Sequence, residues 1–253
     1  MGAELRGRHA LVTGGGRGIG RAIAARLTAA GVRVSIIGRD EATLAAAKAS
    51  GDVWATASAD VTDETATRDA IARLADNAPF DMVIANAGWA ETASFGRSDN
   101  ALFRRMLDVN FMGVVTSFHA ALPAMKDRGY GRLIAIASTA GLRGYPAVSA
   151  YSAAKHAVIG LVRSLALEYA TTGITANAVC PGYTDTDLIR GGAEAIAAKR
   201  GISLEDAKSG FAQDNPMKRL ITPDEVAETV LWLCSPGAAS VSGQAIAING
   251  GEF

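Results

Sequence analysis

Short apolar runs rich in β-branched residues alternate along the chain with longer, alanine-rich segments. Each run has the length of a β-strand, and several are apolar on consecutive residues, which is typical of strands covered on both faces. The pattern therefore predicts a parallel sheet. The predicted strands cover residues 9–14, 33–38, 53–58, 80–88, 131–138, 173–182 and 244–249.

The segments between the predicted strands carry apolar residues three and four positions apart, as amphipathic helices do. The last of them has a clear start signal, with Thr222 as N-cap, Pro223 in the first turn and Glu225 completing a capping box. Strands that alternate with helices predict an α/β fold with a doubly wound parallel sheet and right-handed crossovers. The predicted helices include residues 18–31, 64–78, 99–125, 150–170 and 222–235.

The length of 253 residues allows one large domain. No linker or repeat divides the chain, so we predict a single domain over residues 1–253, with a substrate loop around 187–215. In a doubly wound sheet, ligands bind beyond the carboxyl ends of the strands, where the strand order reverses. The segments that directly follow strands are therefore expected to carry the chemistry.

Charge and composition exclude several other classes of protein. The 25 Lys and Arg residues balance the 25 Asp and Glu residues, so no global field would draw the chain to nucleic acid or to an anionic membrane. Cys180 and Cys234 show no CxxC spacing, which suggests neither a disulfide framework nor a zinc site. No secretory or membrane-spanning segment is evident, and we expect a cytoplasmic protein.

A glycine-rich loop, TGGGRGIG at residues 13–20, follows the first predicted strand and opens a helix. It has the spacing TGxxxGxG, with Gly14, Gly18 and Gly20, rather than GxGxxG. Glycines there let backbone N–H groups approach a pyrophosphate at the helix N-terminus. The alternative is an ordinary tight turn.

The end of the second predicted strand bears on the choice between NADP and NAD. An acidic residue at this place binds the ribose hydroxyl of NAD, whereas an arginine accommodates the 2′-phosphate of NADP. Here the strand ends in Gly38 and Arg39, and Arg17 could face the same phosphate. This favours NADP and leaves NAD possible. Otherwise, Arg39 is merely solvated and Asp40 caps the next helix.

Tyr151 and Lys155 lie four residues apart in YSAAK, hence on one face of a helix. A nearby ammonium stabilises phenolate and can lower the pKa of a tyrosine, which could then act as acid or base. Ser138, at the end of the fifth predicted strand, is placed to hydrogen-bond a substrate oxygen. An isolated YxxxK match more often marks a tyrosine at the edge of the core beside an extended lysine.

Taken in order, these motifs resemble the short-chain dehydrogenase/reductase family in its compact form. The resemblance covers residues 6–251 and implies a Rossmann-like fold and hydride transfer between a nicotinamide cofactor and the carbon of a ketone or secondary alcohol. It is carried by TGGGRGIG at 13–20, ANAG at 85–88, Asn110, Ser138, YSAAK at 151–155 and PGYTDT at 181–186.

The resemblance implies a catalytic role for four residues. Tyr151 would give or take the proton, Ser138 would position the carbonyl, and Lys155 would lower the tyrosine pKa and hold the nicotinamide ribose. Asn110 would hold a water in the proton relay to Lys155. The site residues expected are thus catalytic Asn110, Ser138, Tyr151 and Lys155, with no metal.

The resemblance also implies contacts along the whole cofactor. Asn86, in ANAG rather than NNAG, would stabilise the central sheet near the cofactor. Asp60 and Val61 fit an adenine contact, and the stretch after the sixth strand fits the carboxamide. The predicted cofactor-binding residues are Gly14, Arg17, Gly18, Ile19, Gly20, Arg39, Asp60, Val61, Asn86, Gly88, Tyr151, Lys155, Pro181, Gly182 and Thr186.

Other reactive residue types have no recognisable pattern. His9, His119 and His156 lie far apart without metal-ligand spacing and are interpreted as structural or surface residues. Cys180 is expected to be a small buried thiol. Tyr183 either lines the substrate pocket or packs as an ordinary aromatic residue.

Two alternatives belong to other classes of protein. A cofactor-binding regulator without turnover would be expected to lack Tyr151 or Lys155, and both are present. An epimerase or dehydratase among the longer relatives usually carries a substantial C-terminal substrate domain, whereas here a helix and a strand follow the 187–215 segment.

The C-terminal third is similar to bacterial 3-hydroxybutyrate dehydrogenases and 3-oxoacyl reductases of the family. The dehydrogenases bind a free carboxylate with polar groups at positions that hold Ala90, Ala140 and Val148 here. An unpaired buried charge is costly, so we predict a 3-oxoacyl thioester or hydrophobic ketone with a neutral reacting end. A hydroxy acid is the alternative if Arg190 or Lys199 supplies the charge.

The rest of the expected pocket lining is mostly apolar or aromatic, with Arg143 a possible contact at its mouth. The other expected lining residues are Trp89, Phe95, Leu142, Tyr145, Tyr183, Leu188, Ile189 and Phe211.

The helices at 99–125 and 150–170 carry small and apolar residues, which could pair with a second subunit. The resemblance makes a homotetramer the expected assembly.

Overall fold

The computed structural model describes residues 4–76, 78–213 and 215–253. Seven strands in these residues form one parallel sheet in the order β3-β2-β1-β4-β5-β6-β7, so the strand order reverses between β1 and β4. The strands are β1 (His9–Thr13), β2 (Arg33–Gly38), β3 (Ala55–Ser58), β4 (Met82–Ala85), β5 (Gly131–Ile136), β6 (Ile174–Pro181) and β7 (Ala245–Ile248).

All seven predicted strands are confirmed, although every strand except β2 is shorter than its predicted range. β4 ends at Ala85 because Asn86 leaves the ladder and bonds back to the end of β1. β3 begins only at Ala55, after Trp54 has donated its backbone N–H to Val34 of β2. The doubly wound parallel sheet expected from the pattern is therefore the observed architecture.

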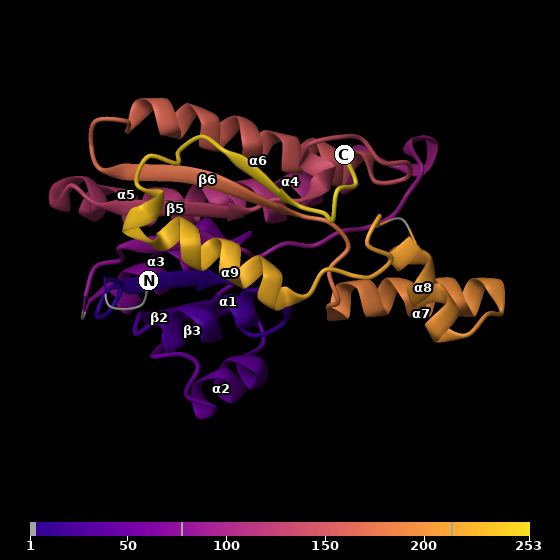
Figure 1. The fold of residues 1–253 in the computed structure, drawn as a ribbon, viewed down its shortest axis with the longest axis horizontal. Helices are drawn as coiled ribbons and strands as arrows, with labels where there is room; N and C mark the ends of the chain where they lie inside the picture. The colour runs from indigo at the N-terminus through magenta and orange to yellow at the C-terminus, as the bar shows by residue number, and fades with distance from the viewer. Residues whose placement is uncertain (1–3, 77, 214) are drawn as a thin grey trace.

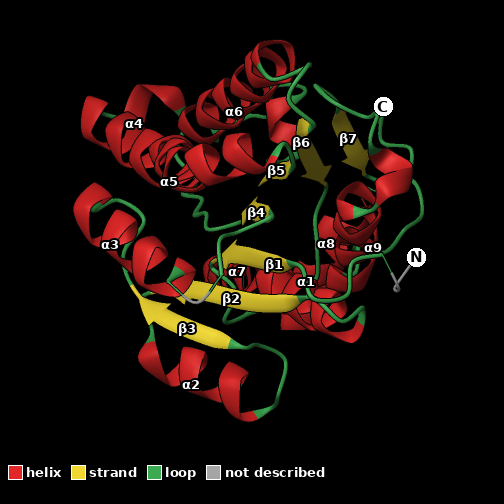
Figure 2. Ribbon diagram, turned by 90° about the vertical axis from the view of Figure 1, so that its left-hand side faces the viewer, coloured by secondary structure: helices red, strands yellow, loops and turns green. Residues whose placement is uncertain are grey.

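Helices cover both faces of the sheet (Figure 2). One face packs against α1, α2 and α9, and the other against α3, α5 and α6. None of the helices in the described ranges is both long and apolar enough to span a membrane. The helices are α1 (Gly18–Ala29), α2 (Glu41–Ala49), α3 (Glu64–Ala75), α4 (Asn100–Leu107), α5 (Gly113–Arg128), α6 (Ser149–Glu168), α7 (Asp187–Arg200), α8 (Leu204–Gln213) and α9 (Pro223–Cys234).

The sheet lies between two apolar layers, which explains why its strands are apolar on consecutive residues. In β1, Val12 belongs to the cluster under α1 and α9, whereas its neighbour Leu11 belongs to the cluster under α3, α5 and α6. Successive side chains of a strand point to opposite faces, and here both faces are buried. The consequence is a rigid sheet whose carboxyl edge is the platform for the site.

The segment expected as a loop around 187–215 instead forms two helices, α7 and α8, joined by a short turn at 201–203. Helices α7 and α8 pack against each other and project from the body of the molecule, at the right of Figure 1. The glycines at 191–192 are poor helix formers, which suggests a loop. The helix α7 nevertheless continues through both glycines. It packs against α8, whose Phe211 ring lies 3.6 Å from where a Cβ of Gly192 would stand.

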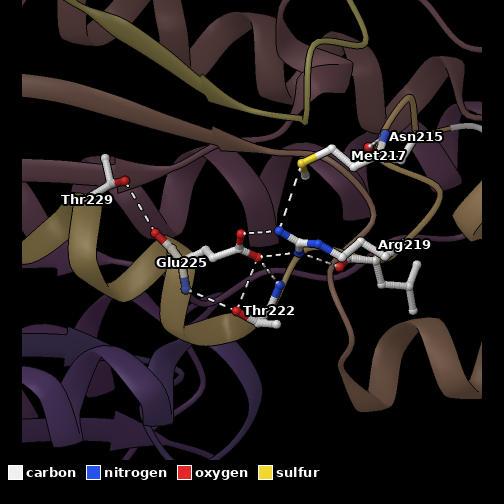
Figure 3. A network of polar contacts seen from close by, with 7 residues as sticks. Asn215, Met217, Arg219, Thr222, Glu225 and Thr229 are labelled. Carbon is white, nitrogen blue, oxygen red and sulfur yellow. Dashed lines mark hydrogen bonds and ion pairs between the residues drawn. The ribbon is translucent and has the colours of Figure 1, made fainter.

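The chain returns from α8 to α9 through the polar network of Figure 3. The Arg219 guanidinium donates to both carboxylate oxygens of Glu225, at 2.7 and 2.8 Å. Glu225 also accepts the backbone N–H of Thr222, and the predicted capping box is confirmed. Hydrogen bonds from Arg219 and Thr222 lower the pKa of Glu225 to about 2. The base of the α7–α8 pair is thereby fixed to the start of α9.

Candidate active site

The predicted functional residues converge on the carboxyl edge of the sheet. Thr13, Ala85, Ile136 and Pro181 end β1, β4, β5 and β6, which are neighbours in the sheet. The glycine loop, Asn86 and Gly182 directly follow the ends of β1, β4 and β6, and Ser138 lies two residues beyond the end of β5. The reversal of strand order between β1 and β4 lies at the same place, as expected for a ligand site in a doubly wound fold.

The glycine loop leaves the N-terminus of α1 open. Gly14 and Gly18 have φ values of 66° and 53°, in the region that favours glycine. A Cβ at Gly20 would collide with the carbonyl oxygen of Gly14, so the loop needs glycine there too. Arg17 does not cap α1 with its side chain, and the first turn of this helix holds no acidic residue. The first backbone N–H groups of α1 therefore remain available to an anion.

Asn86 ties the end of β4 to the end of β1. Its side-chain Nδ2 donates to the carbonyl oxygens of Thr13 and Gly14, at 3.0 and 3.3 Å. The Thr13 hydroxyl in turn accepts the backbone N–H groups of Asn86 and Ala87, both at 3.0 Å. Asn86 therefore joins two central strands of the sheet at the edge of the site. Sequence reasoning missed Thr13, although it opens the TGxxxGxG motif.

Asn110 lies in a π-helical turn, Asp108–Met112, that joins α4 to α5. Its fully buried side chain donates to the carbonyl oxygens of Met106 and Trp89, at 3.1 and 2.8 Å. In a regular α-helix the Met106 carbonyl would accept the backbone N–H of residue 110, so the side chain competes with the helix. π turns of this kind often occur at functional sites.

Asn110 and Lys155 face the same small space at Gly88. A Cβ placed on Gly88 would lie 3.0 Å from Asn110 Oδ1 and 3.6 Å from Lys155 Nζ. The Asn110 Oδ1 atom also accepts the backbone N–H of Trp89, at 3.2 Å. A side chain at position 88 would separate the two polar groups, whereas glycine lets them share one space.

Ser138, Tyr151 and Lys155 come together from β5 and α6. Ser138 lies two residues beyond β5, accepts the backbone N–H of Ala140 at 3.1 Å, and shares a side-chain hydrogen bond with Tyr151. Lys155 Nζ lies one helical turn further along α6, 5.6 Å from the centroid of the Tyr151 ring. Lys155 is 3% exposed, and its ammonium donates to the Ile136 carbonyl oxygen at 2.8 Å.

The electrostatics of the protein on its own differ from the sequence expectation. Burial raises the pKa of Tyr151 to about 12, against a smaller lowering by the hydrogen bond with Ser138. Burial also lowers the pKa of Lys155 to about 8. The expected lowering of the tyrosine pKa by Lys155 is therefore not found, because the ammonium is turned toward the Ile136 carbonyl and desolvation dominates. Burial therefore favours the neutral form of the Tyr151 phenol.

The adenine end expected at β2 and β3 contains a partner for Arg39 that the sequence reasoning did not foresee. The Arg39 guanidinium lies 3.5 Å from the Asp60 carboxylate and remains largely exposed. Burial alone would raise the pKa of Asp60, but hydrogen bonds from Thr62 and Arg39 lower it. Asp40 caps α2, as the alternative interpretation held. Arg17 is exposed and has no ion pair with the described residues.

The stretch after β6 returns to the glycine loop. Gly182 donates its backbone N–H to the Ile248 carbonyl of β7, at 2.9 Å. Thr186, the N-cap residue of α7, has its methyl group 3.4 Å from where a Cβ of Gly18 would stand. Val61, by contrast, packs its side chain against Gly113 at the start of α5. The fold thus brings the expected pyrophosphate and carboxamide segments together.

Apolar residues dominate the expected substrate side. Ala140 is buried, and the Tyr183 and Phe211 rings meet edge to face with centroids 5.0 Å apart. Arg190 and Lys199, the alternative cations, lie exposed on α7. Arg143 is paired with Glu252 of the C-terminal turn, which sequence reasoning missed.

The histidines lie at structural or surface positions, and Cys180 is the small buried thiol that was predicted. His9 is fully buried and bonds to the Ala78 carbonyl and the Ser35 hydroxyl, at 2.7 and 2.8 Å, whereas His119 and His156 are not buried. Cys180 is buried, and burial raises the pKa of its thiol to about 11. The described residues contain no cluster of histidine, cysteine and acidic side chains suited to a metal ion.

Comparisons with known proteins agree with this geometry. The sequence model of the family described as short chain dehydrogenase matches residues 8–196. An acetoacetyl-CoA reductase of Rhizobium meliloti (strain 1021) is 38% identical over 97% of this chain and 98% of its own. A D-beta-hydroxybutyrate dehydrogenase of Cupriavidus necator is 34% identical, over 98% of each chain.

Solved structures show the same fold. The crystal structure of an actinorhodin polyketide ketoreductase variant with NADPH has a TM-score of 0.91 and 35% identity, over 97% of each chain. The crystal structure of levodione reductase has a TM-score of 0.92 and 32% identity, over 98% of each chain.

Proposed function

Because the chain belongs to the short chain dehydrogenase family and is an oxidoreductase that interconverts a ketone and a secondary alcohol, we propose that Tyr151 gives and takes the hydroxyl proton. One observation carries this assignment. Tyr151 shares a hydrogen bond with Ser138 and lies beside the buried ammonium of Lys155. A ketone oxygen held by Ser138 would be within reach of the phenol proton.

The described residues fit a nicotinamide dinucleotide. The open N-terminus of α1 offers backbone N–H groups for a pyrophosphate. The buried Lys155 ammonium has three donors but bonds within the described residues only to Ile136, which leaves donors for the hydroxyls of a ribose. When bound, the nicotinamide supplies or accepts the hydride at its C4 atom.

The protein's own groups manage the proton. In reduction, the phenol of Tyr151 donates its proton to the substrate oxygen as that oxygen becomes negative. Lys155 stabilises the resulting phenolate, and the polar space shared by Lys155, Gly88 and Asn110 supports a relay that returns a proton to Tyr151. Because burial raises the pKa of Tyr151, the neutral phenol required for reduction is the prevailing form near neutral pH.

We propose NADP as the preferred cofactor, with NAD as the alternative. A solved structure similar to this chain is described with NADPH. Gly38 stands where an acidic residue would select NAD, and the exposed guanidinium groups of Arg17 and Arg39 suit a 2′-phosphate. The Asp60 carboxylate beside Arg39 opposes this preference, since it competes with phosphate for the same guanidinium.

The proposed substrate is a 3-oxoacyl thioester or a hydrophobic ketone. Ala90, Ala140 and Val148 bring no charge to the reacting end, and a relative is described as an acetoacetyl-CoA reductase. The relative described as a D-beta-hydroxybutyrate dehydrogenase keeps a hydroxy acid as the second candidate. A homotetramer in the cytoplasm remains our proposal for assembly and location, and Leu107, Met112 and Leu167 are exposed apolar residues that a second subunit would cover.

A side-by-side assay tests this proposal. NADPH oxidation would be followed with acetoacetyl-CoA, ethyl acetoacetate, an aryl ketone and free acetoacetate, and each reaction repeated with NADH. We expect the neutral ketones and the thioester to be reduced with NADPH at higher kcat/KM than acetoacetate. A preference for free acetoacetate would favour the hydroxy acid dehydrogenase, and cofactor binding without turnover of any ketone would favour a regulator.

A further inference from the structure

The chain's C-terminal turn folds back beside the candidate active site. After β7, Gly250 and Gly251 have φ values of 63° and 83°, which let the chain reverse sharply. The Glu252 backbone N–H then donates to the Asn249 carbonyl at 3.3 Å. This reversal leaves the Glu252 side chain 9% exposed, an unusual position for a carboxylate so close to the end of the sequence.

Glu252 is held by two residues of the segment between Ser138 and Tyr151. Its Oε1 atom accepts hydrogen bonds from Arg143 Nη2 at 2.7 Å and from the Tyr145 hydroxyl at 2.6 Å. The Arg143 guanidinium also lies over the rings of Tyr145 and Phe253, 4.5 and 5.1 Å from their centroids. We call these four residues, Arg143, Tyr145, Glu252 and Phe253, the C-terminal cluster.

The C-terminal cluster spans the two segments that flank the substrate side. On one side, Tyr145 has a side-chain hydrogen bond with Thr139, the residue after Ser138. On the other side, Glu252 Oε2 lies 3.7 Å from where a Cβ of Gly182 would stand. The carboxylate of the C-terminal turn therefore lies between the catalytic serine segment and the stretch that follows β6.

The charges in this arrangement decide which substrates are favoured. Arg143 lies on the segment between Ser138 and Tyr151, where Ala140 and Val148 bring no charge, and it is already paired with Glu252. An incoming carboxylate would thus find its counter-ion taken and would meet a second carboxylate, whereas a neutral ketone would meet no such opposition.

We propose that Glu252 is a specificity-determining residue, which excludes substrates that carry a free carboxylate next to the reacting ketone by keeping Arg143 paired. This inference rests on the proposed function and names the residue that restricts its substrate class to neutral reacting ends. It also explains how a chain with an arginine at the mouth of the site can still favour an ester or a thioester over the corresponding acid.

The test compares an acid with its ester in the same variant. Glu252→Gln keeps the size of the side chain and an acceptor for Tyr145 but releases the charge of Arg143. We expect the ratio of kcat/KM for acetoacetate to kcat/KM for ethyl acetoacetate to rise by about 10-fold or more, since close charge pairs at binding sites contribute on this scale. An unchanged or lower ratio would overturn the proposal.

Two further variants separate charge from structure. Arg143→Gln leaves Glu252 unpaired and should lower the acid-to-ester ratio below that of the wild type. The double variant Arg143→Gln/Glu252→Gln carries neither charge, so its ratio should return close to the wild-type value. If the cluster only supported the fold, each variant would change kcat/KM for the acid and for the ester by the same factor. The acid-to-ester ratio would then not rise in Glu252→Gln and fall in Arg143→Gln.

A binding experiment covers the case in which the proposed function fails. If the wild type reduces neither ethyl acetoacetate nor acetoacetyl-CoA, the proposed substrate class is wrong. Titration calorimetry of acetoacetate into the NADP⁺-loaded wild type and Glu252→Gln proteins then measures anion exclusion without turnover. Binding about 10-fold tighter in the variant supports the proposal. Equal affinities, or no binding to either protein, would overturn it.

Discussion

Thr13 should contribute strongly to the stability of the site platform, although it touches neither substrate nor any proposed proton path. Its hydroxyl is the shared acceptor for the backbone N–H groups of Asn86 and Ala87, and the residue is 2% exposed. Thr13→Val preserves the shape of the side chain but removes this acceptor. Two partly buried N–H groups would then lose their partner at the point where β4 leaves the sheet.

The size of the effect follows from the two lost hydrogen bonds. Leaving a buried donor unsatisfied costs about 1–3 kcal/mol, so Thr13→Val should lower the free energy of unfolding by about 2–4 kcal/mol. For a chain of this length, this corresponds to a decrease in Tm of about 5–10 °C. Thr13→Ser is the matched control, because it keeps the hydroxyl and loses only one buried methyl group, which costs about 0.8 kcal/mol.

The assay is thermal unfolding of the three proteins, supported by titration with NADPH. Thr13→Val should unfold well below Thr13→Ser and bind NADPH more weakly, because the Thr13 hydroxyl positions the backbone of Asn86, whose side chain bonds to the carbonyl oxygens of Thr13 and Gly14. If the valine variant unfolded at the same temperature as the serine variant, the two hydrogen bonds would contribute no net stability, and this reasoning would be refuted.

Other predictions concern the chemistry, the cofactor and the pH dependence. Tyr151→Phe should abolish turnover and leave NADPH binding intact, because only the transferable proton is lost; a near-normal kcat would contradict the assignment. Burial lowers the pKa of Lys155 to about 8, so kcat/KM for reduction should fall as pH rises through this value, and a flat profile up to about pH 10 would count against it. Arg39→Asp should shift preference from NADPH toward NADH, which the ratio of the two kcat/KM values measures. Hydrogen bonds from Arg219 lower the pKa of Glu225 to about 2, so its stabilisation is present above its ordinary pKa and is lost as the pH falls toward 2. This exposed pair contributes little because solvent screens it, and unfolding of Glu225→Gln should differ slightly from wild type above about pH 5 and converge with it in acid.

Local patterns in the sequence determined the architecture and the chemical groups of the site. Strands buried on both faces must be apolar on consecutive residues, and this pattern predicts the parallel sheet from the sequence alone. The capping box at Thr222 and Glu225 is local in the same way, because its partners lie three residues apart. Tyr151 and Lys155 could be paired from their spacing alone, since one helical turn brings them together.

Only the tertiary structure decided the properties that depend on distant residues. The 187–213 segment forms two helices that pack against each other, with the Phe211 ring beside Gly192, although its two glycines locally favour a loop. The pKa of Tyr151 is raised rather than lowered, because burial is a property of the assembled site and a four-residue spacing does not reveal it. The pairing of Arg143 with Glu252 joins positions far apart in the chain. The chain reversal at Gly250 and Gly251 brings Glu252 to Arg143 only because β7 lies beside β6 in the sheet.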